Sequence, residues 1–478
     1  MKQLWQITLA EWQYWRRSHL IRNATLLFLG LVITTGILTS ARVHEQNHAR
    51  AHQQTHAENT FKAQPDRHPH RMVHYGHYVF RNAAPLAVFD PGLDAVTGQS
   101  IFLEGHRQNS ATFAESAASA NVAGLSWLSP ALIYQVFAPL LLILLGHSAI
   151  TRERESAVLV PLLSMGITGC TLLAGKALAL ILFSGVLLTP LAINGAITLL
   201  QGETLAAVAT LITIYAIYLT IWVCITLCMA SVLHKRATVL AALAGMWFSL
   251  ILVLPSVAVN IVTYTTPADG KIQTDLRMLA DIRKLGDGHN ANDPAFAKMR
   301  ADLLKKHNVT SVDDLPLNFR GKVAFESEKK LTHVLNNYAA QRQQTQQTQT
   351  HLLTQFGWLT PTMSIALASR AIAGTDLRHY HRFENEAEAL RYDFVQGLNS
   401  AHQTKLSYQD DINRNKDEYA WQRARVDANN WQVLDSYAFT PASTAQRIQH
   451  AATALSILAV WLIGLLALLI LCARRIQP

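Results

Sequence analysis

Two histidines and a glutamate near the start of the chain have the spacing of a zinc-hydrolase site. The segment HEQNH places His44 and His48 one helical turn apart, with Glu45 between them. In H-E-x-x-H metalloproteases the two histidines bind zinc, and the glutamate acts as the general base. The spacing raises the hypothesis of a zinc hydrolase, although no third ligand can be identified from the sequence.

The same histidines also belong to a longer stripe on one helix face. A histidine recurs at every fourth residue, which puts all of them on one side of a helix. The stripe consists of His44, His48, His52 and His56. Two interpretations stay open: a polar face exposed to water or to a partner, and a transition-metal site, since imidazole binds copper, nickel and zinc. A four-residue repeat generates H-x-x-x-H by itself, so the single H-E-x-x-H supports the hydrolase only weakly.

Long apolar stretches surround this stripe. Half of the 478 residues are hydrophobic and 15% are charged, whereas a soluble protein has about a quarter charged residues. Five stretches without Asp, Glu, Lys or Arg are long enough to cross a bilayer, which takes about 20 residues. They are 131–150, 177–200, 204–233, 237–262 and 451–473. A sixth, 24–40, follows Arg22, and we interpret it as an uncleaved anchor rather than a secretory signal.

The basic residues of the short connections predict the orientation. Lys and Arg in short loops favour the cytoplasm, and long loops are largely exempt from this rule. Basic residues precede the first apolar helix, lie between the second and third and between the fourth and fifth, and follow the sixth. Both termini are therefore expected in the cytoplasm, with 41–130 and 263–450 outside. Eleven of the 41 basic residues are these anchors, so the net charge of +9 requires no nucleic-acid partner.

The sequence therefore predicts an all-α polytopic membrane protein with six transmembrane helices. A large, mainly helical extracytoplasmic domain is expected between helices five and six, and a smaller one between helices one and two. The predicted segments are an interfacial helix 1–20, a transmembrane helix 21–40, a histidine-rich external segment 41–130, a transmembrane helix 131–150, a cytoplasmic loop 151–176, transmembrane helices 177–200, 204–233 and 237–262, an external domain 263–450, a transmembrane helix 451–473 and a tail 474–478.

Finer expectations concern the two external segments. Residues 41–62 contain no Gly or Pro, so we expect them to continue the first helix outward. The residues after Pro65 are expected to form loops with a few short strands. For 263–450 a single helical hairpin is the simplest arrangement, with the apolar segment 351–374 lying on the outer membrane surface.

The cysteines indicate that the external domains fold without disulfides. All four lie in or beside the apolar helices. They are Cys170, Cys224, Cys228 and Cys472. Cys224 and Cys228 share one helix face, where they could bind a soft metal or serve as small residues that pack between helices.

The segment ITRERESAVLVPLLSMGITGCTLLAGK, residues 150–176, resembles the segment after the second helix of ABC-2-type permeases. In that family a charged E-R-E-x-G-T-L start leads to L-L-S, an apolar stretch and L-x-G-K. The matching residues are Arg152, Glu153, Arg154, Glu155, Leu162, Leu163, Ser164, Gly175 and Lys176. The departure is Ser156-Ala157-Val158, which stands where Gly-Thr-Leu is usual.

Two external segments narrow the resemblance. They are similar to segments of permeases with a large periplasmic domain of unknown function between helices five and six. The two segments are HYVFRNAAPLAVFDPGLDAVTGQSIFLEGHRQN and PTMSIALASRAIAGTDLRHYHRFENEAEALRYDFVQGLN. Ala-Gly-Thr-Asp at 373–376, Phe383 and Arg391 carry the second match. Such permeases are grouped with the membrane component of systems linked to multicopper enzyme maturation.

The resemblance implies a division of labour with a separate ATPase subunit. The permease binds no nucleotide and receives motion through a short cytoplasmic coupling helix, expected here at 153–166. Residues 169–177 lack the spacing and the Ser or Thr of a phosphate-binding loop. The implied coupling residues are Arg152, Glu153, Arg154, Glu155, Ser164, Gly175 and Lys176. Among them Glu153 and Glu155 are the expected ATPase contacts, unless their charges only anchor the helix in lipid headgroups.

The expected function is therefore that of a permease subunit in a bacterial inner membrane, with no catalytic residue and no cofactor in this chain. It would form a homodimer or pair with a second similar permease, besides contacting the ATPase, the bilayer and a periplasmic partner. Two alternatives are an ATPase-driven mechanotransmitter that acts on that partner, and a membrane-anchored zinc hydrolase that uses His44, Glu45 and His48.

Overall fold

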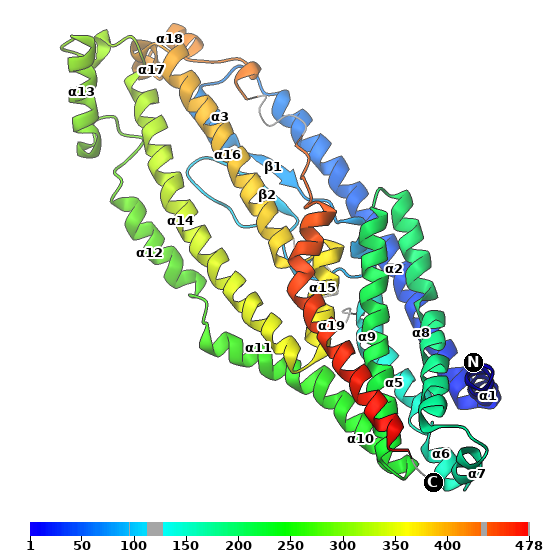
Figure 1. The fold of residues 1–478 in the computed structure, drawn as a ribbon. Helices are drawn as coiled ribbons and strands as arrows, with labels where there is room; N and C mark the ends of the chain where they lie inside the picture. The colour runs from blue at the N-terminus through cyan, green and yellow to red at the C-terminus, as the bar shows by residue number, and fades with distance from the viewer. Residues whose placement is uncertain (95, 112–127, 432–436, 477–478) are drawn as a thin grey trace.

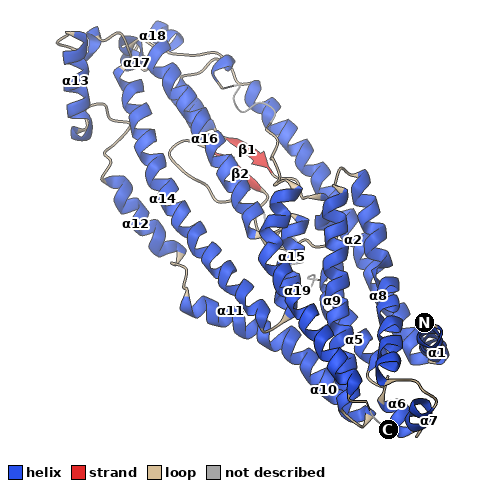
Figure 2. Cartoon of the chain, in the orientation of Figure 1, coloured by secondary structure: helices blue, strands red, loops and turns tan. Residues whose placement is uncertain are grey.

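The chain is an elongated, almost entirely helical molecule. The computed structural model describes residues 1–94, 96–111, 128–431 and 437–476. Helices dominate these residues, and the strands form one small sheet (Figure 2). Both termini lie at the same end of the molecule, called here the terminal end, and the far end carries α13 (Ala297–His307), α17 (Tyr408–Asn413) and α18 (Glu418–Arg423) (Figure 1).

Six helices are long and apolar enough to cross a membrane, which confirms the predicted number among the described residues. They are α2 (His19–Lys62), α5 (Pro130–Gly146) continued by α6 (Thr151–Glu155), α8 (Gly169–Leu200), α9 (Leu205–Val232), α10 (Arg236–Phe248) continued to α11 (Leu254–Thr265), and α19 (Thr444–Arg474). A short polar residue precedes most of them and accepts a backbone N–H of the first turn, as an N-cap does. These caps are Ser18, Ser129, Thr168, Thr204 and Ser443.

The first of these helices continues well beyond its apolar part. α2 has 44 residues, which corresponds to about 66 Å at 1.5 Å per residue. Residues 41–62 continue it without a break, as their lack of Gly and Pro predicts. The fifth helix is interrupted between α10 and α11 by a π-helical turn, Ser249–Val253. Pro255 follows this turn, and proline cannot donate the backbone hydrogen bond of a regular helix.

The six helices differ in how far the rest of the chain covers them. The apolar windows of the second and fourth helices are 72% buried, whereas those of the first and fifth are 22% and 17% buried. α5 and α9 therefore form the centre of the bundle with α8. The first, fifth and sixth helices expose apolar faces, which require lipid or another protein surface.

The first predicted external segment, 41–130, contains short strands, as its composition predicts. It comprises α3 (Pro69–Tyr75), β1 (His77–Phe80), a 3-10 turn at Pro85–Val88 and β2 (Ser100–Leu103). The two strands pair antiparallel, with His77 opposite Leu103. This small unit packs on α16 (Leu377–Lys405) through a shared apolar core.

The second predicted external segment, 263–450, leaves the bundle and returns twice rather than forming one hairpin. α12 (Lys271–Arg283) and α13 run to the far end, and α14 (Phe319–Gln355) returns to the bundle (Figure 1). α16 runs outward again beside α14 and leads to α17 and α18, after which the chain descends to α19. Short 3-10 turns at Pro294–Phe296, Val312–Asp314, Phe356–Trp358 and Ala428–Asn430 complete the segment.

Between the two passages lies α15 (Pro361–Ala373), which corrects the expectation for 351–374. Instead of lying on a surface, α15 packs between α9 and α19 and joins the core of the bundle. Ser369 on α15 donates to the buried carboxylate of Asp90, and Tyr215 of α9 donates to the Ser369 hydroxyl, 3.1 Å away. The hydroxyl of Ser369 is thus paired inside the bundle, as buried polar groups usually are.

Candidate functional site

The charged residues of α6 connect this short helix to two other helices at the terminal end. Arg152 donates to Glu153, 3.1 Å away, and to Glu11 of α1 (Lys2–Arg17). Lys176 of α8 donates to the same Glu11 oxygen at 2.6 Å and also pairs with Glu153. The side chains of Lys176 and Glu11 are only 1% and 4% exposed. Four charges of alternating sign therefore join α1, α6 and α8 in a buried network.

The next two residues of α6 bind a different pair of helices. Arg154 donates to the backbone oxygens of Leu233 and Ser231, at 3.0 and 2.7 Å. These carbonyls belong to the end of α9, where a cation interacts favourably with the helix dipole. Glu155 accepts from the backbone N–H of Arg236 at 2.8 Å and pairs with its guanidinium, at the start of α10. Five residues of chain thus contact α1, α8, α9 and α10, and we call this arrangement the α6 junction.

Gly175 allows α1 to lie directly on α8. A Cβ atom on this glycine would lie 2.8 Å from the Cβ of Ile7 and 3.1 Å from the backbone oxygen of Leu4. Thr8 of α1 donates to the Gly175 carbonyl at 3.0 Å. The Gly-Lys pair singled out by the family resemblance therefore has two local roles, since Gly175 permits close packing and Lys176 supplies the buried charge.

The single coupling helix predicted at 153–166 is wrong. The structure has two short helices, α6 and α7 (Leu159–Ser164), separated at Ser156–Val158. Ala157 adopts a left-handed backbone conformation with φ of 56°, which a continuous α-helix cannot contain. This break coincides with the Ser-Ala-Val that departs from the family's usual Gly-Thr-Leu.

The break changes which side chains face outward. Glu153 is half-buried and engaged with Lys176, whereas Glu155 is exposed and paired with Arg236. Leu159 of α7 is buried, and the exposed residues of α7 and its adjoining turn are Val160, Pro161, Ser164 and Met165. The exposed surface of α7 is therefore mainly apolar, in contrast to the charged helix α6 that precedes it.

Glu11 is the functional candidate that sequence reasoning missed. It is the one acidic residue of α1, and it lies on the buried face with Thr8 and Trp15. A lone acid on the apolar side of a helix beside the membrane signals a charged partner. That pattern is visible in the sequence, but the tryptophans of α1 favour the different interpretation of a purely interfacial helix.

The histidine stripe has the helical spacing that was predicted. All four histidines lie on α2 and are exposed. They are His44, His48, His52 and His56. Within the described parts of the chain, none of them belongs to a group of three or more possible metal ligands. Glu45 is exposed as well, so the H-E-x-x-H segment has no third ligand in this described set.

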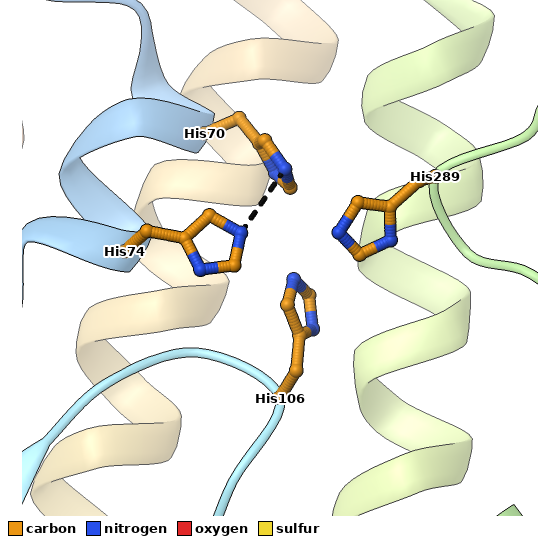
Figure 3. A group of neighbouring side chains, drawn as sticks. All are labelled: His70, His74, His106 and His289. Atoms are coloured by element: carbon orange, nitrogen blue, oxygen red, sulfur yellow. Dashed lines mark hydrogen bonds between the residues drawn. The ribbon is translucent and has the colours of Figure 1, made fainter.

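Other histidines do converge, at two places outside the six apolar helices. His70, His74, His106 and His289 offer ring nitrogens that all lie within 4.8 Å of one another (Figure 3). We call this group the four-histidine cluster. The second group consists of His68, His402 and Asp411, which are buried.

The second group is a hydrogen-bonded knot around one carboxylate. Asp411 pairs with His402 at 2.8 Å, with His68 at 3.1 Å and with Arg414, and accepts from Asn318 at 3.2 Å. Burial would raise the pKa of Asp411, but the hydrogen bonds from His402 and His68 hold it far below its usual range. Because cationic and amide donors already occupy the carboxylate oxygens, the arrangement is that of a structural ion network.

Comparison with known proteins identifies one family. The model of a domain of unknown function, DUF3526, matches residues 272–440, which run from α12 to the loop before α19. No curated protein matches the chain. The matched residues include His289, Glu328 and Arg391, whereas the α6 junction and α3 lie outside the match. Over 272–440 the chain is therefore similar to a family whose function is unknown.

Proposed function

We propose that this chain is the permease subunit of an ABC-2-type transporter in a bacterial inner membrane. It would move a substrate with ATP hydrolysed by a separate ATPase subunit, and both termini would lie in the cytoplasm. The sequence resemblance of residues 150–176 suggests this class, and six apolar helices are compatible with it. The α6 junction is the observation that carries the proposal.

The geometry of the junction suits the transmission of motion. α6 is too short to deform smoothly, and its four charged side chains each bond to a different neighbouring segment. A rigid displacement of α6 would therefore act on α1, α8, α9 and α10 together. Coupled shifts of packed helices are one of the standard ways in which a local movement becomes a global one.

The ATPase contact would then form mainly through α7 rather than through Glu153. Val160 and Met165 are 50% and 76% exposed at the terminal end of the molecule. Apolar side chains at the centre of an interface commonly supply most of its binding energy. Glu155, exposed beside them, would add charge recognition at the rim.

A second copy, or a similar permease, would cover part of the exposed bundle. The first and fifth helices are among the least buried of the six, and ABC permeases work in pairs. The apolar faces of α2 and of α10–α11 are therefore the candidate pairing surfaces. Blue-native electrophoresis combined with cysteine cross-linking along these two faces would test the pairing.

The coupling proposal is tested by co-expression with the ATPase encoded by the neighbouring gene. We expect the wild-type chain to co-purify with that ATPase, and Val160→Asp with Met165→Asp to abolish the complex. Arg154→Gln should keep the complex but lower the permease-dependent stimulation of ATP hydrolysis at least tenfold, because α6 loses its bond to α9. Arg17→Gln, which removes an exposed charge of α1, is the matched control and should behave as wild type.

Two outcomes would count against this function. One is the absence of any complex with the wild-type chain under conditions in which both proteins are folded. The other is a complex whose ATPase activity is insensitive to both Arg154→Gln and the α7 double substitution.

A mechanotransmitter that acts on a periplasmic partner is the second candidate, because long helices extend from the bundle. α14 has 37 residues, which corresponds to about 55 Å, and α2 also continues well past its apolar part. Such helices would relay movement of the bundle to the far end of the molecule. ATP-dependent transport of a defined solute in sealed vesicles would favour the permease over this alternative.

A further inference from the structure

The four-histidine cluster is assembled from three segments that are distant in sequence. His70 and His74 lie one turn apart on α3, His106 lies in the turn after β2, and His289 lies in the loop after α12. Their rings point toward a common centre (Figure 3). Ring centroids are separated by 4.7 Å for His70 and His74 and by 4.9 Å for His106 and His289.

The nitrogen spacing approaches that of ligands around one metal ion. Nitrogens bound to a tetrahedral metal at 2.0–2.1 Å lie about 3.4 Å apart. The Nε2 atoms of His70 and His74 are 3.2 Å apart, and the other nitrogens of the group lie within 4.8 Å. Small rotations of the side chains would close the remaining separation, and His74 and His289 are exposed.

His106 is oriented as metal-bound histidines are. Its Nδ1 lies 2.9 Å from a carboxylate oxygen of Glu328 on α14. Glu328 is fully buried and is itself held by Arg391, whose Nη1 donates at 2.7 Å. A carboxylate behind a ligating histidine fixes the tautomer and turns the other nitrogen toward the metal. That other nitrogen, Nε2, is buried and has no hydrogen-bond partner among the described residues.

Burial disfavours the charged form of His70, His74 and His289, and a neutral ring is the form that binds a metal. Burial and the neighbouring histidines lower the pKa of His70 to about 2. Burial and His106 lower the pKa of His74 and of His289. Burial opposes ionisation of Glu328, but the hydrogen bond from His106 and the charge of Arg391 lower its pKa to about 2.

We propose that His70, His74, His106 and His289 bind one divalent transition-metal ion, with Glu328 as the positioning residue behind His106. Imidazole ligands suit Zn²⁺, Cu²⁺ and Ni²⁺ rather than Mg²⁺ or Ca²⁺, which take oxygen ligands. Four ring nitrogens are also the number of ligands that tetrahedral Zn²⁺ takes. Two half-exposed and two exposed ligands leave the site open to metal from the solvent.

Bound metal would connect parts of the fold that otherwise have few contacts. α3 and the β2 turn belong to the first external segment, and His289 belongs to the loop between α12 and α13. The ion would fasten this loop against the first external segment, beside the α14–α16 pair that Glu328 and Arg391 join. The proposal is independent of transport and holds whether or not the chain pairs with an ATPase.

The test measures Zn²⁺ binding by the full chain in detergent after removal of bound metal with a chelator. We expect one tightly bound equivalent by elemental mass spectrometry after dialysis, and none with Mg²⁺. His74→Ala with His289→Ala should weaken the affinity at least 100-fold, measured by competition with a chromophoric chelator. His44→Ala with His52→Ala removes two exposed histidines of α2 and should leave the stoichiometry and affinity unchanged.

Glu328→Gln distinguishes a positioning role from a general loss of fold. We expect Zn²⁺ affinity to fall between 10- and 100-fold, while the metal-free variant elutes as a folded monodisperse species. The proposal is overturned if the wild-type chain retains no Zn²⁺, if the His74/His289 variant binds as wild type does, or if the His44/His52 control loses the bound equivalent.

Discussion

The α6 junction and the four-histidine cluster are both assembled from several segments of the chain, but their polar groups are paired differently. Each brings together side chains from at least three segments, and each lies outside the apolar centre of the bundle. At the junction four charges face opposite charges, since Glu11 and Glu153 both pair with Arg152 and Lys176. At the cluster the nitrogens face one another, and the buried Nε2 of His106 lacks a partner among the described residues.

This difference separates a mechanical connection from a ligand site. The paired charges of the junction resist separation of the helices that they join, although Arg152 Nη1 and Glu153 Oε2 have no hydrogen-bond partner among the described residues. Two neutral rings can share one N–H···N hydrogen bond, as His70 and His74 do, but that bond does not account for the convergence of four rings. Their convergence is accounted for once an ion occupies the centre.

Removing the central cation of the junction should have the largest effect. Lys176→Met leaves the buried carboxylates of Glu11 and Glu153 side by side with only Arg152 to neutralise them. Breaking a buried ion pair by removing one partner costs about 3–5 kcal/mol, and we expect a comparable loss in the free energy of unfolding. Thermal denaturation followed by size-exclusion fluorescence in detergent would measure it.

Lys235→Met is the matched control for that substitution. Lys235 is exposed at the same end of the molecule, and exposed substitutions usually change stability by less than about 0.5 kcal/mol. If Lys176→Met were as mild as Lys235→Met, the junction would not be the connection described here.

Metal removal should have the next largest effect, and only where the four-histidine cluster is intact. An ion present at 100 times its dissociation constant stabilises the folded state by about 2.7 kcal/mol. Chelation should therefore lower the melting temperature of the wild-type chain and of the His44/His52 control. The His74/His289 variant should already melt at the lower temperature and should not respond to the chelator. An equal response of all three proteins would contradict the cluster as the source of the stabilisation.

Close packing at the junction should give a smaller but specific effect. Gly175→Ala places a methyl group 2.8 Å from the Cβ of Ile7, and overpacking of this kind typically costs about 1–3 kcal/mol. Gly185 lies in the same helix, and no described atom lies within 4 Å of the place that an alanine methyl group would take there. We therefore expect Gly185→Ala to be neutral or stabilising by up to about 1 kcal/mol. Equal effects at both glycines would show that α1 does not rest on α8 at Gly175.

The sequence predicted those features that depend on local composition. Six apolar stretches predicted six long apolar helices, because crossing a bilayer demands a minimum apolar length. The continuation of α2 to Lys62 followed from the absence of Gly and Pro after residue 40. The single helix predicted over 153–166 was wrong, because the chain breaks at Ser156–Val158 into α6 and α7.

The features that depend on contacts between distant segments were not predictable from one sequence. Spacing along α2 made His44 to His56 visible as a stripe, whereas His106 and His289 gave no sign that they meet α3. The residues of α15 form an apolar segment whose location the sequence does not indicate, since its place between α9 and α19 depends on the whole bundle. Glu11 is an intermediate case, since its position among apolar residues was visible but its partners were not.

The smallest effect is expected for the histidine stripe of α2, although its spacing is the clearest of these patterns in the sequence. Replacing His44, His48, His52 and His56 together by Gln keeps a polar face on α2 and removes no contact to the four-histidine cluster. Because all four side chains are exposed, each substitution should change the free energy of unfolding by less than about 0.5 kcal/mol, and the bound Zn²⁺ should remain. Circular dichroism melting with and without chelator measures both quantities. Loss of the bound ion in this variant, with the four-histidine cluster untouched, would show that the metal binds the histidines of α2 instead. That result is not expected, because one straight helix can direct at most two of these rings toward the same point. The coordination of a single ion therefore favours the four-histidine cluster, whose ligands converge from three segments.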